Sequence, residues 1–258
     1  MGSRAFISGS TQGIGFAIAK ELATEGADVI LNGRTADGCD SAAQRLRGMV
    51  PGASVEVIAA DFAEPDQVTD LVARLGEVDI LINNVGVFDL VDFATTDDAA
   101  WDHYLQVDLM SAVRLSRAVL PRMLERGSGR ILSIASESGV NVPADMIPYG
   151  VAKAGLIALS NGLAKLTRGT EVTVNTILGG PTYSDGVAEV VEGIAQVQGV
   201  DSSNVKRGIE ATRPESLLGR FLDPKEIATL AAYLVSPLAS ATNGAAIRAD
   251  GGVLTTTL

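Results

Sequence analysis

The stretch that decides the fold is Ala5-Phe6-Ile7-Ser8-Gly9-Ser10-Thr11-Gln12-Gly13-Ile14-Gly15. A short apolar run, Ala5–Ser8, leads into three glycines, and a segment with apolar residues at helical spacing follows. Glycines at a strand-to-helix turn let the backbone approach a pyrophosphate closely, and the first N–H groups of the helix then face that anion. We therefore predict that Gly9, Ser10, Thr11, Gln12, Gly13, Ile14 and Gly15 form the phosphate end of a dinucleotide site.

Short apolar or β-branched runs alternate with longer helical patterns through the rest of the chain. Further strands are predicted at Asp28–Asn32, Ser54–Ala59, Val78–Asn83, Arg130–Ala135, Glu171–Leu178 and Ala245–Ala249, and helices at Ile14–Glu25, Gln67–Leu75, Trp101–Glu125, Tyr149–Arg168 and Pro224–Val235. Such alternation is typical of βαβ units, which build a mainly parallel sheet covered on both faces. The sequence therefore predicts an α/β fold in one domain, residues 1–258, with a doubly wound parallel sheet of about seven strands.

Residues 181–217 interrupt this alternation. They contain no strand-like run, and we expect one helix over about Asp185–Val197, a polar stretch over Gln198–Asn204, and a second helix that ends before Pro214. An irregular insertion of this length in a compact domain is usually functional, often as a lid over a site. The alternative is a solvated excursion without a role.

The composition argues against several classes of protein. Hydrophobic residues make up 47% of the 258 residues and charged residues 20%, which is typical of a globular protein with a sizeable core. The net charge of −11 argues against nucleic acid and anionic membrane surfaces as partners, because both require basic patches. Cys39 has no second cysteine with which to form an internal disulfide, and no apolar run is long enough to span a bilayer. We expect a cytoplasmic protein.

A basic residue follows the second predicted strand, in Val29-Ile30-Leu31-Asn32-Gly33-Arg34. Sites of this geometry that select NAD carry an acid near this point, which bonds the ribose 2′-hydroxyl. Here the residue is Arg34, whose guanidinium suits a 2′-phosphate. The sequence therefore favours NADP over NAD, while NAD stays open. The alternative for Arg34 is a solvated loop position.

Tyr149 and Lys153 stand four residues apart, in Pro148-Tyr149-Gly150-Val151-Ala152-Lys153. On a helix this spacing places both side chains on one face, one turn apart. An ammonium beside a phenol stabilises the phenolate, so we expect the pKa of Tyr149 to fall and the residue to act as a general acid or base. The alternative is an ordinary pair on a helix surface.

Together these motifs resemble the short-chain dehydrogenase/reductase family in its classical form, over nearly the whole chain. The glycine turn, the segment Asn83-Asn84-Val85-Gly86, Ser136, Tyr149 and Lys153 occur in the family's order, and Ser136 precedes Tyr149 by the family's usual thirteen residues. Asp61, with Phe62 beside it, is similar to the residue that contacts the adenine ring, and Asp250-Gly251-Gly252 is similar to the C-terminal signature. The resemblance implies a Rossmann-like fold, a nicotinamide cofactor held in part by Asn84 and Gly86, and a homo-oligomer, tetramer or dimer.

The resemblance also implies the roles of the residues at the chemical end. Tyr149 exchanges a proton with the substrate oxygen, Lys153 binds the nicotinamide ribose and keeps the tyrosine acidic, and Ser136 hydrogen-bonds the reacting carbonyl or alcohol. The chemistry agrees, because hydride transfer to a carbonyl leaves an alkoxide unless a donor meets it. Ser138, eleven residues before Tyr149, is the alternative to Ser136. No cluster of His and Cys in the sequence is suited to zinc, so we expect no metal.

The chain departs from the family's pattern in two places. In Gln106-Val107-Asp108-Leu109 an acid replaces the usual Asn, whose backbone carbonyl continues a proton relay from the lysine. If the Asp108 carboxylate lies near Lys153, it favours the charged lysine and alters the pH profile, or else weakens the enzyme. In Leu178-Gly179-Gly180-Pro181 the usual Pro-Gly is changed. Gly180 is still expected to meet the cofactor, and Thr182 bonds either the cofactor or the start of the next helix.

The sequence leaves the substrate open. The leading interpretation is an NADP-preferring oxidoreductase acting on a small carbonyl or secondary alcohol, with Tyr183, Ser184, Asp185 and Glu189 of the lid as hydrogen-bonding groups. A 3-oxoacyl thioester reductase is the alternative, with the basic residues Lys206, Arg207 and Arg213 facing its phosphopantetheine carrier. A weakly catalytic NADP-binding regulatory protein is the alternative from a different class, and Asp108 is its main support.

Overall fold

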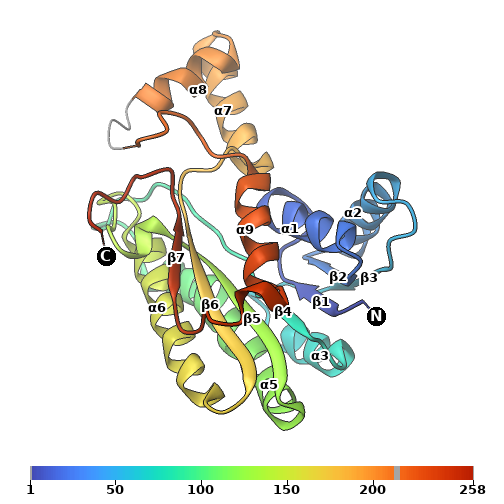
Figure 1. The fold of residues 1–258 in the computed structure, drawn as a ribbon. Coiled ribbons are helices and arrows are strands. Elements are labelled where there is room, and N and C mark those ends of the chain that lie inside the picture. The colour runs from blue at the N-terminus through green and yellow to red at the C-terminus, as the bar shows by residue number, and fades with distance from the viewer. Residues whose placement is uncertain (1, 212–215, 258) are drawn as a thin grey trace.

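The computed structural model describes residues 2–211 and 216–257, which form a seven-stranded parallel sheet in the order β3-β2-β1-β4-β5-β6-β7 (Figure 1). The strands are β1 (Arg4–Ile7), β2 (Asp28–Gly33), β3 (Val55–Ala59), β4 (Ile80–Asn83), β5 (Ser128–Ser136), β6 (Glu171–Gly179) and β7 (Ala246–Ala249). Every predicted strand has a counterpart in the sheet. The chain winds from β1 outward to β3, then crosses to β4 and winds the other way. The predicted doubly wound α/β fold is confirmed.

Helices cover both faces of the sheet, as continuous apolar strands require. One face carries α1 (Gly13–Thr24), α2 (Ala36–Met49) and α9 (Pro224–Val235), whose apolar side chains form one core with β1 and β2. The other face carries α3 (Pro65–Leu75), α5 (Ser111–Arg126) and α6 (Ile147–Ala164). Because neighbouring residues of a strand point to opposite faces, Phe6 packs in the second core while Ala5 and Ile7 pack in the first.

One helix, α2, is absent from the predicted set. Its fourteen residues include two glycines and only four buried side chains, Cys39, Ala42, Ala43 and Leu46, so its apolar stripe is narrow and weak. Thr35 begins the helix by accepting a hydrogen bond from the Gly38 backbone N–H at 3.2 Å. Tertiary packing therefore stabilises this helix, although the spacing of its apolar residues does not predict it.

The helix predicted over Trp101–Glu125 is interrupted. The structure has α4 (Asp98–Tyr104), then a π-helical turn (Leu105–Met110), then α5. A π turn holds an extra residue and often occurs at functional sites. Asp108 lies in this turn and is buried.

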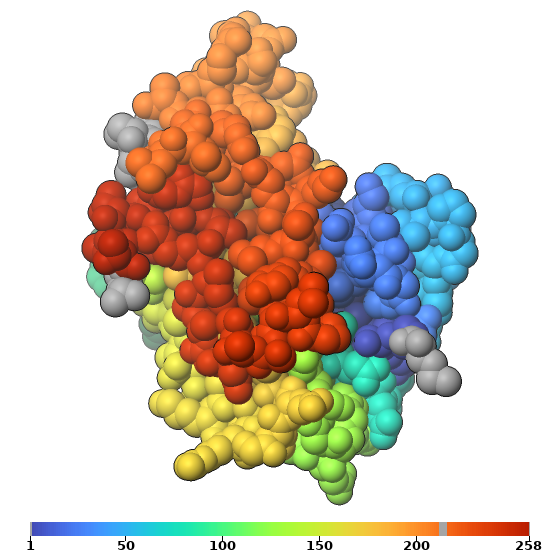
Figure 2. Space-filling view, viewed as in Figure 1, coloured from blue at the N-terminus to red at the C-terminus, as the bar shows by residue number. Residues whose placement is uncertain are grey.

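The segment after β6 holds α7 (Asp185–Gln198) and α8 (Ser202–Ala211), which stand out beyond the body of the molecule (Figures 1 and 2). The first helix predicted within residues 181–217 is confirmed by α7. The prediction of a polar stretch over Gln198–Asn204 is wrong in its second half, because α8 begins at Ser202. Gly199, in the left-handed region at φ 65°, ends α7. The predicted stop before Pro214 lies outside the described residues.

The carboxyl ends of the parallel strands gather the predicted site residues at one edge of the sheet. The glycine turn follows β1, Arg34 follows β2, Asp61 follows β3, and Gly86 follows β4. Strands β1 and β4 are neighbours although β2 and β3 intervene in the chain, so the strand order reverses between them. Open α/β sheets bind ligands in the crevice at such a point.

Candidate active site

A cleft of about 800 Å³ lies along this edge of the sheet. It runs from the end of β2 past the glycine turn to α6. The predicted residues that line it are Gly9, Thr11, Gln12, Gly13, Ile14, Gly15, Arg34, Asp61, Phe62, Asn84, Gly86, Tyr149 and Lys153. Among these predicted residues, the cleft unites positions up to 144 residues apart in the sequence, Gly9 and Lys153.

The glycine turn needs its glycines for two different reasons. Gly9 and Gly13 have φ angles of 61° and 59°, in the left-handed region that other residues avoid. Gly15 is crowded instead: a Cβ there would collide with the Gly9 carbonyl oxygen and with the side-chain amide of Asn84. A Cβ on Gly9 would also lie 2.9 Å from Val85 Cα. The turn is thus a stretch of backbone without side chains at Gly9, Gly13 and Gly15.

Asn84 and Ser10 fix the shape of this turn. The Asn84 side-chain amide donates to the Ser8 and Gly9 carbonyl oxygens, at 2.9 Å each, so it ties the end of β4 to the turn. The Ser10 hydroxyl is fully buried and donates to the Ile7 carbonyl oxygen at 2.8 Å. Asn84 lines the cleft, whereas Ser10 is not among the residues that line it and supports the turn from behind.

The segment after β6 places a carboxylate against the same turn. Asp185, the first residue of α7, accepts a hydrogen bond from the Gly13 backbone N–H at 2.6 Å. Gly13 is the first residue of α1, where free N–H groups and the positive end of the helix dipole attract anions. An acidic side chain therefore lies where the sequence predicts a phosphate.

The far end of the cleft is lined by Arg34 with Thr35 and Gly38, opposite Asp61 and Phe62. Arg45 of α2 borders this end: its guanidinium lies 3.9 Å from the centre of the Phe16 ring and donates to the Thr11 carbonyl oxygen at 2.8 Å. The predicted 2′-phosphate end is thus basic, and Arg34 is the cleft-lining cation there.

The other end of the cleft brings the predicted chemical residues together. Tyr149 and Lys153 lie one turn apart on α6, with the ammonium 5.4 Å from the centre of the phenol ring. Ser136, the last residue of β5, lies near enough to the Tyr149 phenol to lower its pKa. Phe88 packs edge-on against the Tyr149 ring, with 6.4 Å between ring centres. A phenol, a hydroxyl and an ammonium thus converge at the mouth of the cleft.

Asp108 lies beside Lys153, so the condition under which the acid would favour the charged lysine is met. The Lys153 Nζ atom is 3.0 Å from Asp108 Oδ1, and the side chains are 5% and 0% exposed. Asp108 Oδ2 accepts a hydrogen bond from the Val87 backbone N–H at 3.1 Å. Gly86 passes directly over the pair, because a Cβ there would lie 2.6 Å from Asp108 Oδ1 and 2.9 Å from Lys153 Nζ. The π turn, α6 and the loop after β4 therefore meet at one buried ion pair.

Burial changes the pKa values of Tyr149 and Lys153 from those that the sequence predicts. Burial raises the pKa of Tyr149, and the charges of Asp108 and Glu137 add to this, against the lowering by Lys153 and by the hydrogen bond with Ser136. The predicted fall in the pKa of Tyr149 is therefore wrong in the free protein, because removing the phenolate from water outweighs the nearby ammonium. Burial alone lowers the pKa of Lys153, yet the Asp108 carboxylate offsets this and holds that pKa above its usual value.

Two residues predicted to contact the cofactor, Gly180 and Thr182, are not among those that line the cleft. Gly180 packs on the backbone of Asp250, where a Cβ would lie 2.5 Å from its carbonyl oxygen, and it is not among the cleft-lining residues. The buried Thr182 hydroxyl donates to the Gly180 carbonyl oxygen at 2.9 Å, so it neither lines the cleft nor caps α7. Ser184, two residues on, lines the cleft instead.

Comparison with known proteins decides the family. A family model described as short chain dehydrogenase matches residues 3–195. The chain belongs to the short-chain dehydrogenase family. An uncharacterised oxidoreductase, YvrD, of Bacillus subtilis (strain 168) is 44% identical over 252 residues, 96% of this chain and 95% of that protein. D-beta-hydroxybutyrate dehydrogenase of Cupriavidus necator (strain ATCC 17699) is 32% identical over 255 residues, 97% of each protein.

A solved structure supports the same family for this chain. L-sorbose reductase from Gluconobacter frateurii, complexed with NADPH and L-sorbose, superposes with a TM-score of 0.93 at 32% identity, over 99% of this chain and 97% of that chain. The relatives are named as oxidoreductases and dehydrogenases. The chain is accordingly an oxidoreductase that acts on a CH–OH or C=O group.

Sequence reasoning missed several groups at the site of this short-chain dehydrogenase. Glu137 directly follows Ser136 and bonds to it, and its place next to the serine was the only available signal. His103 lines the cleft, but a lone histidine on a helix gives no functional pattern. Phe88 lies in the loop after β4, where aromatic residues are not diagnostic.

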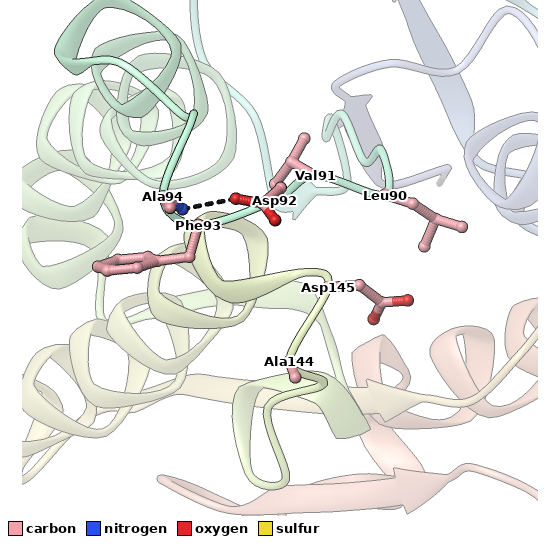
Figure 3. Close-up of a pocket in the computed structure, with 7 residues that line it drawn as sticks. All are labelled: Leu90, Val91, Asp92, Phe93, Ala94, Ala144 and Asp145. Atoms are coloured by element: carbon pink, nitrogen blue, oxygen red, sulfur yellow. Dashed lines mark hydrogen bonds between the residues drawn. The ribbon is translucent and has the colours of Figure 1, made fainter.

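A second, shallower hollow lies near the mouth of the cleft, at the surface (Figure 3). It measures about 580 Å³ and is lined by the loop after β4 (Leu90, Val91, Asp92, Phe93 and Ala94) and the loop before α6 (Ala144 and Asp145). The Val91 backbone N–H donates to the Asp145 carbonyl oxygen at 2.8 Å, which joins the two loops. Tyr149 and Lys153 line the deeper cleft and not this hollow.

Residues 2–211 and 216–257 contain no group of three or more His, Cys, Asp or Glu side chains placed to hold a metal ion. The helices within those ranges include none that is both long and apolar enough to cross a membrane.

Proposed function

We propose that this chain is an NADP-preferring oxidoreductase that interconverts a small carbonyl compound and its secondary alcohol, with Tyr149 as the residue that exchanges a proton with the substrate oxygen. The observation that carries the proposal is the meeting of Tyr149, Ser136 and Lys153 at one end of a cleft whose other end carries the glycine turn and Arg34.

The cleft suits a dinucleotide along its whole length. Gly9 and Gly15 line the cleft without side chains, as the close approach of a pyrophosphate requires, and Gly86 lines it beside Lys153. Arg34 supports NADP rather than NAD, because its guanidinium suits a 2′-phosphate; NAD stays the second choice. When bound, the cofactor supplies or accepts a hydride with its electron pair at the substrate carbon.

The chain's own residues handle the proton. In reduction, the Tyr149 hydroxyl gives its proton to the substrate oxygen, so no free alkoxide forms. The Lys153 ammonium stabilises the phenolate left behind, and Asp108 keeps that ammonium charged. Ser136 positions the substrate oxygen beside the phenol. In oxidation the same groups act in reverse, with the phenolate as base.

The lid and the assembly state extend this proposal. Residues 181–217 act as a lid, supported by the contact of Asp185 with the glycine turn. The chain works as a homo-oligomer, a dimer or tetramer, in the cytoplasm. Within the long helices, Leu120 and Leu156 are buried in the cores of the single chain, so an interface would use other side chains.

The basic groups of the lid favour a small substrate over a carrier-bound thioester. The Lys206 ammonium lies 4.1 Å from the centre of the Tyr183 ring, and Arg207 donates to the Asn204 side chain at 2.5 Å. Both cations are thus engaged within the lid, and Arg213 lies outside the described residues. A 3-oxoacyl thioester reductase is the second candidate function.

The test is a spectrophotometric screen for oxidation of NADPH and NADH with ketones, sugars and a 3-oxoacyl thioester. The expected result is turnover of a ketone or sugar with NADPH preferred, and its loss in Tyr149→Phe, which keeps the ring but removes the proton. The Tyr233→Phe variant, at an exposed position of α9, is the matched control. NADPH binding without turnover across the whole panel would instead favour a regulatory binding protein.

A further inference from the structure

Arg45 is a cation of α2 whose guanidinium is held against the glycine turn. It donates to the Thr11 carbonyl oxygen at 2.8 Å and lies 3.9 Å from the centre of the Phe16 ring. Thr11 lines the cleft, whereas Phe16 belongs to α1. A long arginine side chain has many rotamers, and these two contacts restrict them. They therefore fix a positive charge at the border of the cleft.

The Thr11 side chain connects this cation to the end of β2. A Cβ on Gly33 would collide with the Thr11 methyl group, so the two residues are in close contact. Gly33 is the last residue of β2 and precedes Arg34, and both of them line the cleft. The residue that holds the Arg45 guanidinium is therefore in direct contact with the neighbour of Arg34.

The position of Arg45 along α2 directs its side chain to the same end of the cleft. Gly38 lines the cleft, and Arg45 follows it by seven residues (38 to 45), which is close to two turns of an α-helix. The two residues therefore share one face of α2. Side chains on a helix lean toward its N-terminus, so the Arg45 side chain reaches back toward Gly38.

The charges that line this end of the cleft do not by themselves favour an anion. Among the described residues that line it, Arg34 carries a positive charge and Asp61 a negative one. Asp37, in the first turn of α2, is a second acid only three residues after Arg34. A phosphate monoester carries a charge of about −1.5 to −2 at pH 7. Arg34 alone therefore leaves this end without the net positive charge that such a group requires.

The charge of Arg45 is available to meet this need. Its two contacts are with a neutral carbonyl oxygen and a neutral ring, and no ion pair found in the described part of the chain includes it. The glycine turn that it contacts is itself uncharged from Gly9 to Gly15. Arg45 therefore adds a positive charge where the lining residues sum to none.

We propose that Arg45 is a specificity-determining residue for the cofactor: its charge, held beside Thr11, is the second positive charge that attracts the 2′-phosphate of NADP. The inference rests on the proposed function, because NAD has no 2′-phosphate. Arg34 meets the phosphate from the lining of the cleft, and Arg45 strengthens the attraction from α2. Because Arg45 is exposed, its contribution is electrostatic and falls as the salt concentration rises.

The experiment compares NADP⁺ with NAD⁺, which differ only by the 2′-phosphate. Isothermal titration calorimetry gives the dissociation constant of each for the native chain and for a charge series at position 45. The measured quantity is the preference, the ratio of the NAD⁺ constant to the NADP⁺ constant. We expect Arg45→Lys to keep it within about twofold, Arg45→Gln to lower it about fivefold and Arg45→Glu about 25-fold, since each unit of charge acts like an exposed ion pair.

The matched control is Arg47→Gln, which removes the same charge from the same helix. The Arg47 guanidinium donates to the Val55 carbonyl oxygen of β3, so this variant should keep the native preference. Raising the ionic strength from about 0.05 M to about 0.5 M should bring native and Arg45→Gln preferences together. An unchanged preference in Arg45→Gln overturns the inference. Equal weakening of both cofactors also overturns it, because Arg45 would then only support the shape of the turn.

Binding separates this inference from the proposed function. A native chain that prefers NADP⁺ but turns over no carbonyl in the screen overturns the proposed activity, while the charge series still decides the role of Arg45. A native chain that binds NAD⁺ as tightly as NADP⁺ overturns both the NADP preference and this role. Circular dichroism reports folding, and if Arg45→Gln is not folded, Arg45→Lys and Arg45→Glu are compared. Equal preferences in those two variants contradict the role given to Arg45.

Discussion

The Lys153 ammonium lies 3.0 Å from the Asp108 carboxylate, and both side chains are buried. The two residues come from different elements, α6 and the π turn, so the pair joins the helix of the proposed catalytic tyrosine to the opposite wall of the cleft. The same pair therefore keeps the lysine charged and holds α6 against the π turn.

Replacing the acid of this pair should change the pH dependence of the reaction. Asp108 raises the pKa values of both Lys153 and Tyr149, so Asp108→Asn should lower both. While the lysine stays charged, the phenolate becomes easier to form, and the alkaline limb of carbonyl reduction should move about one unit toward lower pH. Superimposable pH–rate profiles for the native chain and Asp108→Asn would show that the acid has no electrostatic role.

Removing the lysine should cost stability as well as activity. Lys153→Met leaves the Asp108 carboxylate buried without its cation, and breaking a buried pair from one side costs about 3–5 kcal/mol of unfolding free energy. The double variant Asp108→Asn/Lys153→Met should recover much of this loss, because no buried charge remains. Urea unfolding measures both. A double variant no more stable than Lys153→Met contradicts this account.

A side chain at Gly86 should disturb the site without unfolding the chain. In Gly86→Ala the new methyl meets Asp108 Oδ1 and Lys153 Nζ at less than 3 Å, so the pair must move, at a cost of about 1–3 kcal/mol and with a loss of turnover. Gly48→Ala is the control: it lies within α2 with open space around it, and should stabilise by about 0.5–1 kcal/mol. Thermal unfolding and NADPH oxidation are the measurements.

Arg34 should determine the choice between the two cofactors. Losing a charge-assisted hydrogen bond costs about 1.5–3 kcal/mol, so Arg34→Ala should raise the KM for NADPH by about 10- to 150-fold and leave that for NADH nearly unchanged. Arg117→Ala, on α5, controls for the loss of one positive charge. If both KM values rise together, Arg34 supports the loop rather than reading the 2′-phosphate.

Much of this molecule could be predicted from sequence because its signals are local. The glycine turn, the strand ends and the Tyr149–Lys153 spacing each depend on a few neighbouring residues, and the structure places them along one cleft. The missing parts depend on long-range packing. Helix α2 is held by the sheet rather than by its own pattern, and the π turn that buries Asp108 breaks the period on which helix prediction relies.

The errors at the site have the same origin. The direction of the Tyr149 pKa follows from burial, which spacing on a helix does not reveal. The Thr182 hydroxyl bonds to the Gly180 carbonyl oxygen, and Gly180 packs on Asp250, both contacts that the local sequence does not indicate. The contact of Gly13 with Asp185 spans 172 positions, beyond any local pattern.

The hydrogen bond between the Gly13 N–H and Asp185 should weaken cofactor binding. The Asp185 carboxylate accepts from the Gly13 N–H, which a pyrophosphate also needs, so the two anions compete. Asp185→Asn should therefore tighten NADPH binding several-fold, which corresponds to about 1 kcal/mol. Fluorescence titration with NADPH is the measurement, and Glu192→Gln, on the same helix, is the control. Weaker binding in Asp185→Asn would mean that the acid helps to build the site.

The π turn Leu105–Met110, whose Val107 lines the cleft, makes the site sensitive to chain length. Successive residues of a regular helix are rotated by about 100° around its axis. Deleting one residue between Leu105 and Asp108 would let α4 and α5 join as one regular helix. Asp108 would then rotate away from Lys153 by about that angle, although every residue that lines the cleft beyond the turn is unchanged. A short-chain dehydrogenase with this acid therefore has to keep its extra residue, and the two features are expected to be inherited together.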